Sequence, residues 1–158
     1  MVKASTTTAG AQATPRGCTN LKLRQLSREL TRHYDAYVAP TGLKNTQYSL
    51  LSHVVRLGPI KPGELAARMR LDASTLTRNL QPLVVQGWLA LGPGEDARSR
   101  SVSVTEAGRE KRAEGQRAWK QAQLALNARL GIGRVAALHA LVDECMGALD
   151  AADDEECA

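Results

Sequence analysis

Apolar residues recur along most of this chain at steps of three and four, the spacing that places side chains on one face of an α-helix. The pattern is clear from Thr19 to about position 38, where Leu23, Leu26 and Leu30 fall on one side. The same spacing predicts further helices over residues 46–57, 73–86 and 135–149, and residue types that start or stop helices predict two more over 62–70 and 105–130. The chain is therefore expected to be mainly α-helical.

Residue types that start or stop helices mark the expected boundaries. A side-chain oxygen before the first turn can accept a hydrogen bond from a backbone N–H, and we expect this of Thr19 or Asn20, of Asp72 and of Thr105. Glycine readily adopts the backbone conformation that ends a helix, and the expected stops are Gly87, Gly131 and Gly133.

Between residues 87 and 105 the pattern changes from helical to extended. Residues 88–91 and 102–104 have the character of two short strands, and residues 92–100 between them are rich in turn formers and arginine. This combination predicts a β-hairpin with a basic tip. Two helices joined by a short turn at 71–72 and followed directly by a hairpin are typical of a winged helix-turn-helix. The expected fold class is mainly α with a small β-hairpin.

Charge is distributed unevenly along the 158 residues, which carry a net charge of +5. Residues 1–60 hold eight basic and two acidic side chains, residues 61–112 hold nine and six, and residues 113–158 hold four and eight. A basic front and an acidic end favour an anionic partner that touches only part of the molecule. An ordinary solvated surface would give the same counts.

Composition disfavours several other classes of protein. The longest uncharged run, residues 79–94, is interrupted by proline and glycine, so no membrane span is expected, and residues 1–17 lack the apolar stretch of a secretory signal. The three cysteines form no disulfide framework, and neither they nor the histidines have metal-ligand spacing. Without a nucleotide-binding or hydrolase motif, we expect no cofactor and no enzymatic activity, and a cytoplasmic location.

Three segments resemble one family of proteins. The run DASTLTRNLQPLVVQGW at 72–88 is similar to the recognition-helix region of MarR-type (multiple antibiotic resistance) transcription regulators. The run DARSRSVSVTEAG at 96–108 resembles that family's wing and the start of its fifth helix, and residues 43–51 look like the opening of its second helix. The chain is therefore identified, by resemblance, as a DNA-binding regulator.

The resemblance implies a single domain over residues 18–150. It would consist of a winged helix-turn-helix at about 45–104 and dimerisation helices at about 19–39 and 105–150, between a flexible arm at 1–17 and an acidic tail at 151–158 whose end is expected to be frayed. The family's two-fold homodimer agrees with the apolar faces of the first and last two helices, which exceed what a small winged domain can cover. An intrachain helical bundle is the alternative.

The expected DNA contacts lie on the recognition helix and the wing. In the major groove, Arg78 can pair bidentately with guanine, and the hydroxyls of Ser74 and Thr75 can serve base edges or phosphates. Weaker candidates on the same helix, which could equally form a solvated face, are Thr77, Asn79 and Gln81. In the adjoining minor groove, Arg98 matches the family's wing arginine, with Arg100 second, and Asp96 would hold an arginine in place.

A homodimer with one recognition helix per protomer implies a pseudo-palindromic operator, with half-sites about one helical turn, roughly 34–36 Å, apart. The family resemblance further implies a repressor that releases DNA when a small aromatic acid or phenol binds between the dimer helices and the winged domain. The candidate pocket residues are Arg28, Tyr34, Tyr37, Gln47 and His53. His53 could equally be a satisfied core or interface histidine.

Two alternative functions remain open from the sequence. Cys18 could act as a thiol-based oxidation sensor, since it lies near a helix start and beside Arg16. Its register differs by about half a helical turn from the reactive cysteine of the family's peroxide-sensing branch. Cys145 falls on an apolar stripe, where it would act as a small hydrophobe, and Cys157 lies in the tail. The second alternative is a protein-interaction dimer with a vestigial winged domain.

Overall fold

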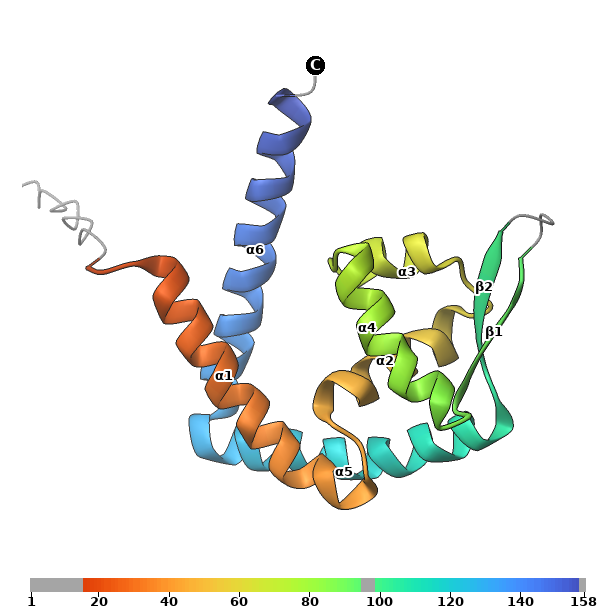
Figure 1. The fold of residues 1–158 in the computed structure, drawn as a ribbon. Helices are drawn as coiled ribbons and strands as arrows, with labels where there is room; N and C mark the ends of the chain where they lie inside the picture. Colours follow the sequence, from red (N-terminus) through yellow and green to blue (C-terminus); the bar gives the residue numbers. More distant parts are fainter. Residues whose placement is uncertain (1–15, 95–98, 157–158) are drawn as a thin grey trace, which may run out of the picture.

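The computed structural model describes residues 16–94 and 99–156, and within these the side chains of 152–156 are left out of account. Six α-helices, one short 3-10 helix and two strands follow one another along these residues (Figure 1). In chain order they are α1 Thr19–Val38, the 3-10 helix Ala39–Thr41, α2 Asn45–Leu57, α3 Pro62–Arg68, α4 Ala73–Val85, β1 Leu89–Pro93, β2 Arg100–Val104, α5 Glu106–Leu130 and α6 Ile132–Glu156. The predicted fold class, mainly helical with one hairpin, is confirmed.

Most of the expected helix boundaries are also found. Asp72 caps α4 by accepting a hydrogen bond from Thr75 N–H at 2.8 Å, and Thr105 caps α5 by accepting from Gly108 N–H at 3.0 Å. The chain leaves α4 at Gly87, whose φ of 72° lies in the left-handed region. Glycine is suited to that position because it has no Cβ to clash there.

Three expectations about helix ends were wrong. Neither Thr19 nor Asn20 caps α1, because both lie inside it and Cys18 occupies the capping position without a side-chain hydrogen bond. Gly133 does not end a helix: the break occurs at Gly131, with φ 86°, and Gly133 lies inside α6. The backbone of α6 also continues to Glu156, so the part of the expected frayed tail up to that residue is helical.

The buried core lies almost entirely in the half of the molecule formed by α2, α3, α4 and the hairpin. Its fully enclosed members are leucines and valines, among them Leu51, Leu65, Leu83 and Val102. The strands pair antiparallel, with Leu89 opposite Val104 and Leu91 opposite Val102. Ile60 adds a short third edge through two backbone hydrogen bonds to Val102, so the segment before α3 is joined to the hairpin.

The long helix α5 connects this winged half to α1 and α6, as Figure 1 shows along the base of the molecule. Gly115 lets α5 approach α2, because a Cβ there would meet the Tyr48 ring at 2.8 Å. On the other side, Tyr34 of α1 donates a hydrogen bond to Gln123 of α5 at 2.6 Å, and His33 Nε2 bonds the Ala122 carbonyl at 2.8 Å. The helix α1 is thereby fixed to α5.

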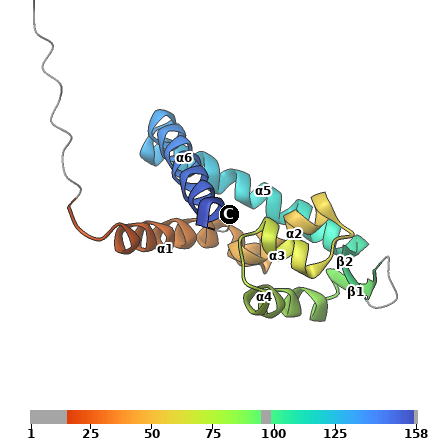
Figure 2. The ribbon, with the colours of Figure 1, turned by 90° about the horizontal axis from the view of Figure 1, so that it is seen from above.

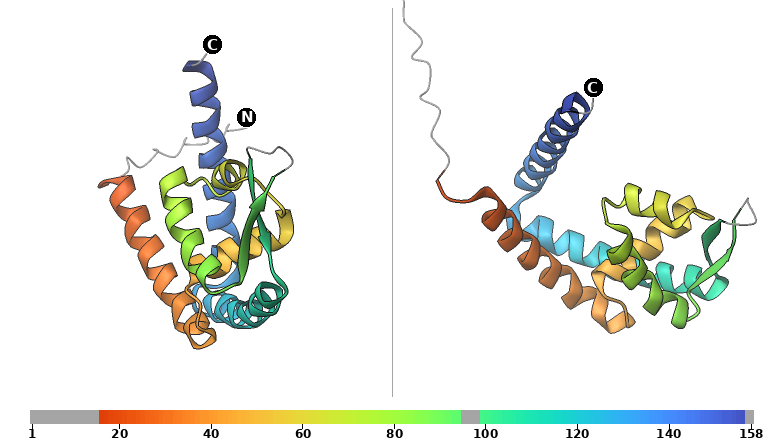
Figure 3. Two further views of the ribbon diagram at one scale, coloured as in Figure 1. Left: turned by 45° about the vertical axis from the view of Figure 1, so that its right-hand side comes forward. Right: turned by 45° about the horizontal axis from the view of Figure 1, so that its top comes forward.

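The outer ends of α1 and α6 leave apolar side chains uncovered. Exposed residues on these two helices include Leu21, Leu23, Ile132, Leu141 and Leu149, each more than half exposed. Figure 2 and the right-hand view of Figure 3 show both helices at the side of the molecule away from the hairpin. Contiguous apolar surfaces of this kind commonly mark interaction sites.

Candidate nucleic-acid interface

Helix α4 presents its polar residues on the outer side of the winged half. Figure 2 shows α4 at the edge of that half, with α2 and α3 between it and α5. Leu76, Leu80 and Leu83 are buried against the core and orient the helix. Ser74, Thr77, Arg78 and Gln81 are exposed, and Thr75 and Asn79 are half-buried. The structure thus places these six predicted DNA contacts on one helix, with Thr75 and Asn79 less exposed than the other four.

The start of α4 is organised around one carboxylate. Ser74 Oγ donates to Asp72 Oδ1 at 2.5 Å, and Thr75 Oγ1 donates to Asp72 Oδ2 at 2.6 Å. The Thr75 backbone N–H also donates to Oδ1. The hydrogen bonds from Ser74 and Thr75 hold the pKa of the Asp72 carboxyl well below its usual range. This carboxylate was predicted as a helix cap, but its two hydroxyl partners were not.

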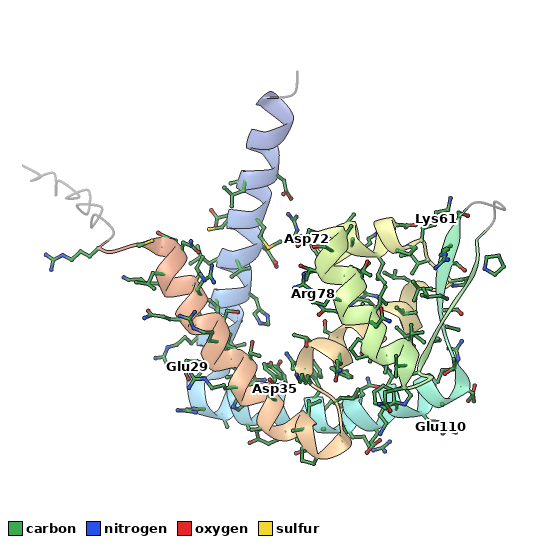
Figure 4. The ribbon with its side chains drawn as sticks, in the orientation of Figure 1. Glu29, Asp35, Lys61, Asp72, Arg78 and Glu110 are labelled. Carbon is green, nitrogen blue, oxygen red and sulfur yellow. The ribbon has the colours of Figure 1, made fainter. Side chains whose placement is uncertain are left out.

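Arg78 lies in the second turn of α4 with its side chain exposed (Figure 4). It makes no ion pair or hydrogen bond with any other described residue. A guanidinium presents five N–H donors and no acceptor, in a planar fork that matches the O6 and N7 acceptors of guanine. Arg78 therefore has the freedom and the chemistry that a base contact requires.

The expected wing contacts fall mainly on the hairpin tip. Asp96 and Arg98 lie outside the described residues, so their roles stay predictions. Arg100 is exposed at the start of β2, and it lines a cavity of about 220 Å³ together with Thr77 and Gln81 of α4. The structure therefore places Arg100 beside α4.

Lys61 is a basic residue near this surface that the sequence argument did not single out. It precedes the first turn of α3, is exposed, and lines a hollow with Pro93, Gly94 and Ser101 of the hairpin (Figure 4). A lysine next to the wing has the charge for a phosphate contact. Its place directly before the helix-starting Pro62 was the available signal, but the link to the hairpin depends on the fold.

An exposed ion pair joins the winged half to α6. Arg70, in the turn between α3 and α4, donates from Nη1 and Nη2 to the two carboxylate oxygens of Asp150 at 2.8 and 2.6 Å. The hydrogen bond from Arg70 and its charge hold the pKa of Asp150 below its usual value. This contact connects the turn that positions α4 to the last turns of α6.

The five candidate effector residues do not line one common pocket. Tyr34 faces a groove of about 550 Å³ between α1, α5 and α6, lined mainly by apolar side chains such as Leu26, Leu126 and Leu138. His53 instead lines a smaller hollow. The Gln47 side chain accepts a hydrogen bond from the Lys44 backbone N–H at 2.9 Å, so it serves as part of the α2 cap. Arg28 and Tyr37 lie exposed on α1 and line neither hollow.

The smaller hollow, about 290 Å³, lies between α2 and α5 and is lined by Asn45, Tyr48, Ser49, Ser52, His53 and Trp119. Trp119 stacks at 6.2 Å on Tyr48 and at 6.3 Å on Tyr34, which gives the hollow an aromatic wall. His53 Nδ1 donates to the Ser49 carbonyl at 2.8 Å, so a neutral His53 keeps a lone pair on Nε2. The Ser52 hydroxyl is buried and has no hydrogen-bond partner among the described residues.

Other chemistry finds little support in the described part of the chain. It contains no cluster of three or more His, Cys, Asp or Glu side chains that could hold a metal ion. Its helices are all too short or too polar to cross a lipid bilayer. Cys18 and Cys145 are free thiols and both are exposed, so the structure leaves the expected role of Cys145 as a small hydrophobe a prediction. Cys157 lies outside the described residues.

Comparison with known proteins places this arrangement among transcription regulators. A family model described as MarR family matches residues 41–99. The uncharacterized HTH-type transcriptional regulator YwoH of Bacillus subtilis (strain 168) is 28% identical over 90 residues, which are 57% of this chain and 66% of YwoH. The match therefore spans just under two thirds of that relative.

Solved structures agree over most of the chain. The M. tuberculosis transcriptional regulator MosR in complex with DNA is 30% identical, with a TM-score of 0.67, over 82% of this chain and 98% of that one. A mutant MarR from E. coli complexed with operator DNA has a TM-score of 0.73, and the match covers 80% of this chain and 91% of that one. At 23% identity, MarR supports the fold alone. These relatives are regulators and not enzymes.

Proposed function

Because the chain belongs to the MarR family of transcription regulators, we propose that it acts as a homodimeric repressor of a pseudo-palindromic operator. The observation that carries this proposal is the exposed polar face of α4, where Arg78, which has no ion pair or hydrogen bond among the described residues, lies beside the hydroxyls of Ser74 and Thr75. A buried leucine stripe holds this face outward, as a helix that enters a major groove requires.

The proposed dimer is supported by the uncovered apolar surface of α1 and α6. Leu23, Leu141 and Leu149 are more than half exposed, and the apolar groove between these helices is open. A second copy of the chain would cover this surface and place a second α4 at a fixed distance from the first. Two such helices would read half-sites about one helical turn, roughly 34–36 Å, apart.

The proposal is tested by selecting bound fragments from the host genome with the purified chain. We expect enriched fragments to share a two-fold symmetric motif, and their affinity to fall steeply as salt rises, because phosphate contacts release counterions. A reporter gene placed behind the motif should be repressed. Arg117→Ala removes an exposed arginine from α5, away from α4, and this control variant should bind the enriched fragments as tightly as the wild type. Retention of no fragment at low salt would refute the proposal.

The effector is proposed to be a small aromatic acid or phenol that binds in the hollow between α2 and α5. The stacked rings of Tyr48 and Trp119 suit an aromatic ligand. The Ser52 hydroxyl can donate to a ligand oxygen, and His53 Nε2 can accept from a phenol or, when protonated, donate to a carboxylate. An unpaired buried hydroxyl costs about 1–3 kcal/mol, which a bound oxygen would offset.

A melting-temperature screen with benzoate, salicylate and phenol tests this pocket. Binding to the folded state raises the apparent melting temperature, and the same compound should release operator DNA. Ser52→Ala should abolish both effects, whereas Ser27→Ala, in the groove between α1 and α6, should not. Equal responses of the two variants would place the effector elsewhere. The oxidation-sensor and protein-interaction alternatives have no specific observation in their favour.

A further inference from the structure

The two hydroxyl groups in the first turn of α4 have their protons committed to Asp72. Ser74 Oγ and Thr75 Oγ1 lie 2.5 and 2.6 Å from different oxygens of this carboxylate. An ionised carboxylate only accepts hydrogen bonds, so both hydroxyls must be the donors. The hydrogen bonds that lower the pKa of Asp72 keep it ionised throughout the neutral range.

This commitment decides what the two side chains can offer a ligand. A hydroxyl has one proton and two acceptor lone pairs, so after donating to Asp72 it can only accept. Ser74 is exposed and Thr75 half-buried at the outer end of α4. The first turn therefore presents acceptor atoms, whereas Arg78 in the next turn presents only donors.

We propose that Asp72 sets the base preference of the recognition helix by making Ser74 and Thr75 acceptors that read exocyclic amino groups in the major groove. The amino groups there are adenine N6 and cytosine N4, whereas guanine O6 and thymine O4 are acceptors. A hydroxyl could turn toward an acceptor only by giving up a charge-assisted bond, which is about twice as strong as a neutral one. This inference rests on the proposed function. It excludes phosphate contacts for the two hydroxyls, because phosphate oxygens are acceptors and a hydroxyl that has donated its proton cannot donate to them.

Thr77 offers a comparison within the same helix. Its hydroxyl donates to the Ala73 carbonyl at 2.8 Å, a neutral bond to the helix backbone. The proton of Thr77 is therefore held less strongly than those of Ser74 and Thr75. We therefore expect a fixed preference for amino groups only from Ser74 and Thr75, because the Asp72 carboxylate holds their protons.

The test starts from a pool of randomised DNA duplexes. Bound duplexes are selected separately with the wild-type chain, with Ser74→Ala and with Thr75→Val. A position at which the base preference weakens in one variant is the position that the removed hydroxyl reads. At these positions, purine in place of adenine or pyrimidin-2-one in place of cytosine removes only the amino group. We expect the wild type to lose about 3- to 10-fold in affinity, the range of one hydrogen bond, and the matched variant to lose nothing further.

Asp72→Asn tests the role of the carboxylate itself. Asparagine is as good a helix cap as aspartate, so the Thr75 N–H keeps an acceptor. Its amide NH2 would donate to one hydroxyl and release that hydroxyl's proton. We expect the penalty for amino-group removal to shrink and selection at the same position to shift toward guanine or thymine. Circular dichroism should show unchanged helix content, and Asp143→Asn on α6 should keep the wild-type profile.

The outcomes separate this inference from the proposed function. An unchanged wild-type affinity after removal of the amino group would overturn the inference but not the proposed function. A base-selection profile of Asp72→Asn identical to that of the wild type would do the same. A selection profile that neither Ser74→Ala nor Thr75→Val changes would do the same. Failure of the wild type to select any duplex would overturn both.

Discussion

At the residue scale, Arg78 and Arg98 are expected to act on different parts of the duplex. Arg78→Ala should relax the preference at one position of each half-site at a cost of about 1–3 kcal/mol, because a bidentate base contact is lost. Arg98→Ala should weaken binding to all sequences alike. It should also reduce the slope of log affinity against log salt concentration by about 1, as expected when one charge-dependent contact is lost. Titration of matched and mismatched duplexes at three salt concentrations separates the two. A uniform loss for Arg78→Ala would contradict its assignment.

Residue types and helical phase were enough to predict four of the side chains that α4 turns outward, whereas Thr75 and Asn79 are half-buried. They were also enough to predict Asp72 as a cap. They could not predict that Asp72 takes two hydroxyl protons as well, because this depends on rotamers in the folded turn. The role of Gln47 was equally hard to predict from the sequence. Its side chain accepts a hydrogen bond from the Lys44 backbone N–H instead of lining a pocket.

At the element scale, the contact between α5 and the hairpin depends on Gly108. A Cβ at Gly108 would lie 1.9 Å from the Trp88 carbonyl oxygen, and backbone cannot move aside as a side chain can. Gly108→Ala should lower the free energy of unfolding by about 1–3 kcal/mol, the usual cost of overpacking. Gly133→Ala has open space inside α6 and should raise it by about 0.5–1 kcal/mol. Equilibrium urea unfolding measures both, and equal stabilities would contradict the packing argument.

Apolar spacing and boundary residues together located the six α-helices of the described residues, because apolar spacing reflects which face the core covers; the 3-10 helix Ala39–Thr41 was not predicted. Helix ends were harder to predict. Gly131 and Gly133 have the same side chain, yet only Gly131 adopts a positive φ. Glycine permits a break without requiring one, so its presence alone does not decide which position is used. The strands also run further than alternation alone indicated, to Pro93 and from Arg100, because paired backbone continues toward the hairpin tip.

At the scale of the whole molecule, the ion pair between Arg70 and Asp150 should respond to pH. The pKa of Asp150 is lowered in the folded chain, so the contact is present above the usual aspartate pKa and is lost as pH falls through the lowered value. The Arg70 Nε–H resonance should follow this loss in an NMR titration with a midpoint below about 3.9. Asp150→Asn should remove the transition, and Asp143→Asn should keep it. A midpoint at or above 3.9 would contradict the pairing.

Contacts between distant segments could not be predicted from the sequence. Arg70 and Asp150 are 80 residues apart, and no local pattern pairs them. The same holds for the hollow that joins Ser52 and His53 of α2 to Trp119 of α5. Apolar spacing did indicate an excess of uncovered surface on the terminal helices, because that excess follows from counting apolar faces against the size of the winged core.

That excess leads to a prediction about assembly. Leu141 and Leu149 are 57% and 69% exposed on α6, so replacing both with aspartate should leave the protomer folded. If a second copy covers them, the double variant should weaken dimerisation on the order of 10³-fold or more, since each buried leucine contributes about 1.5–3 kcal/mol. Sedimentation velocity should show a wild-type dimer and a variant monomer. Val85→Asp, at an equally exposed site on α4, should stay dimeric. A monomeric wild type would exclude paired recognition helices, and with them a two-fold operator.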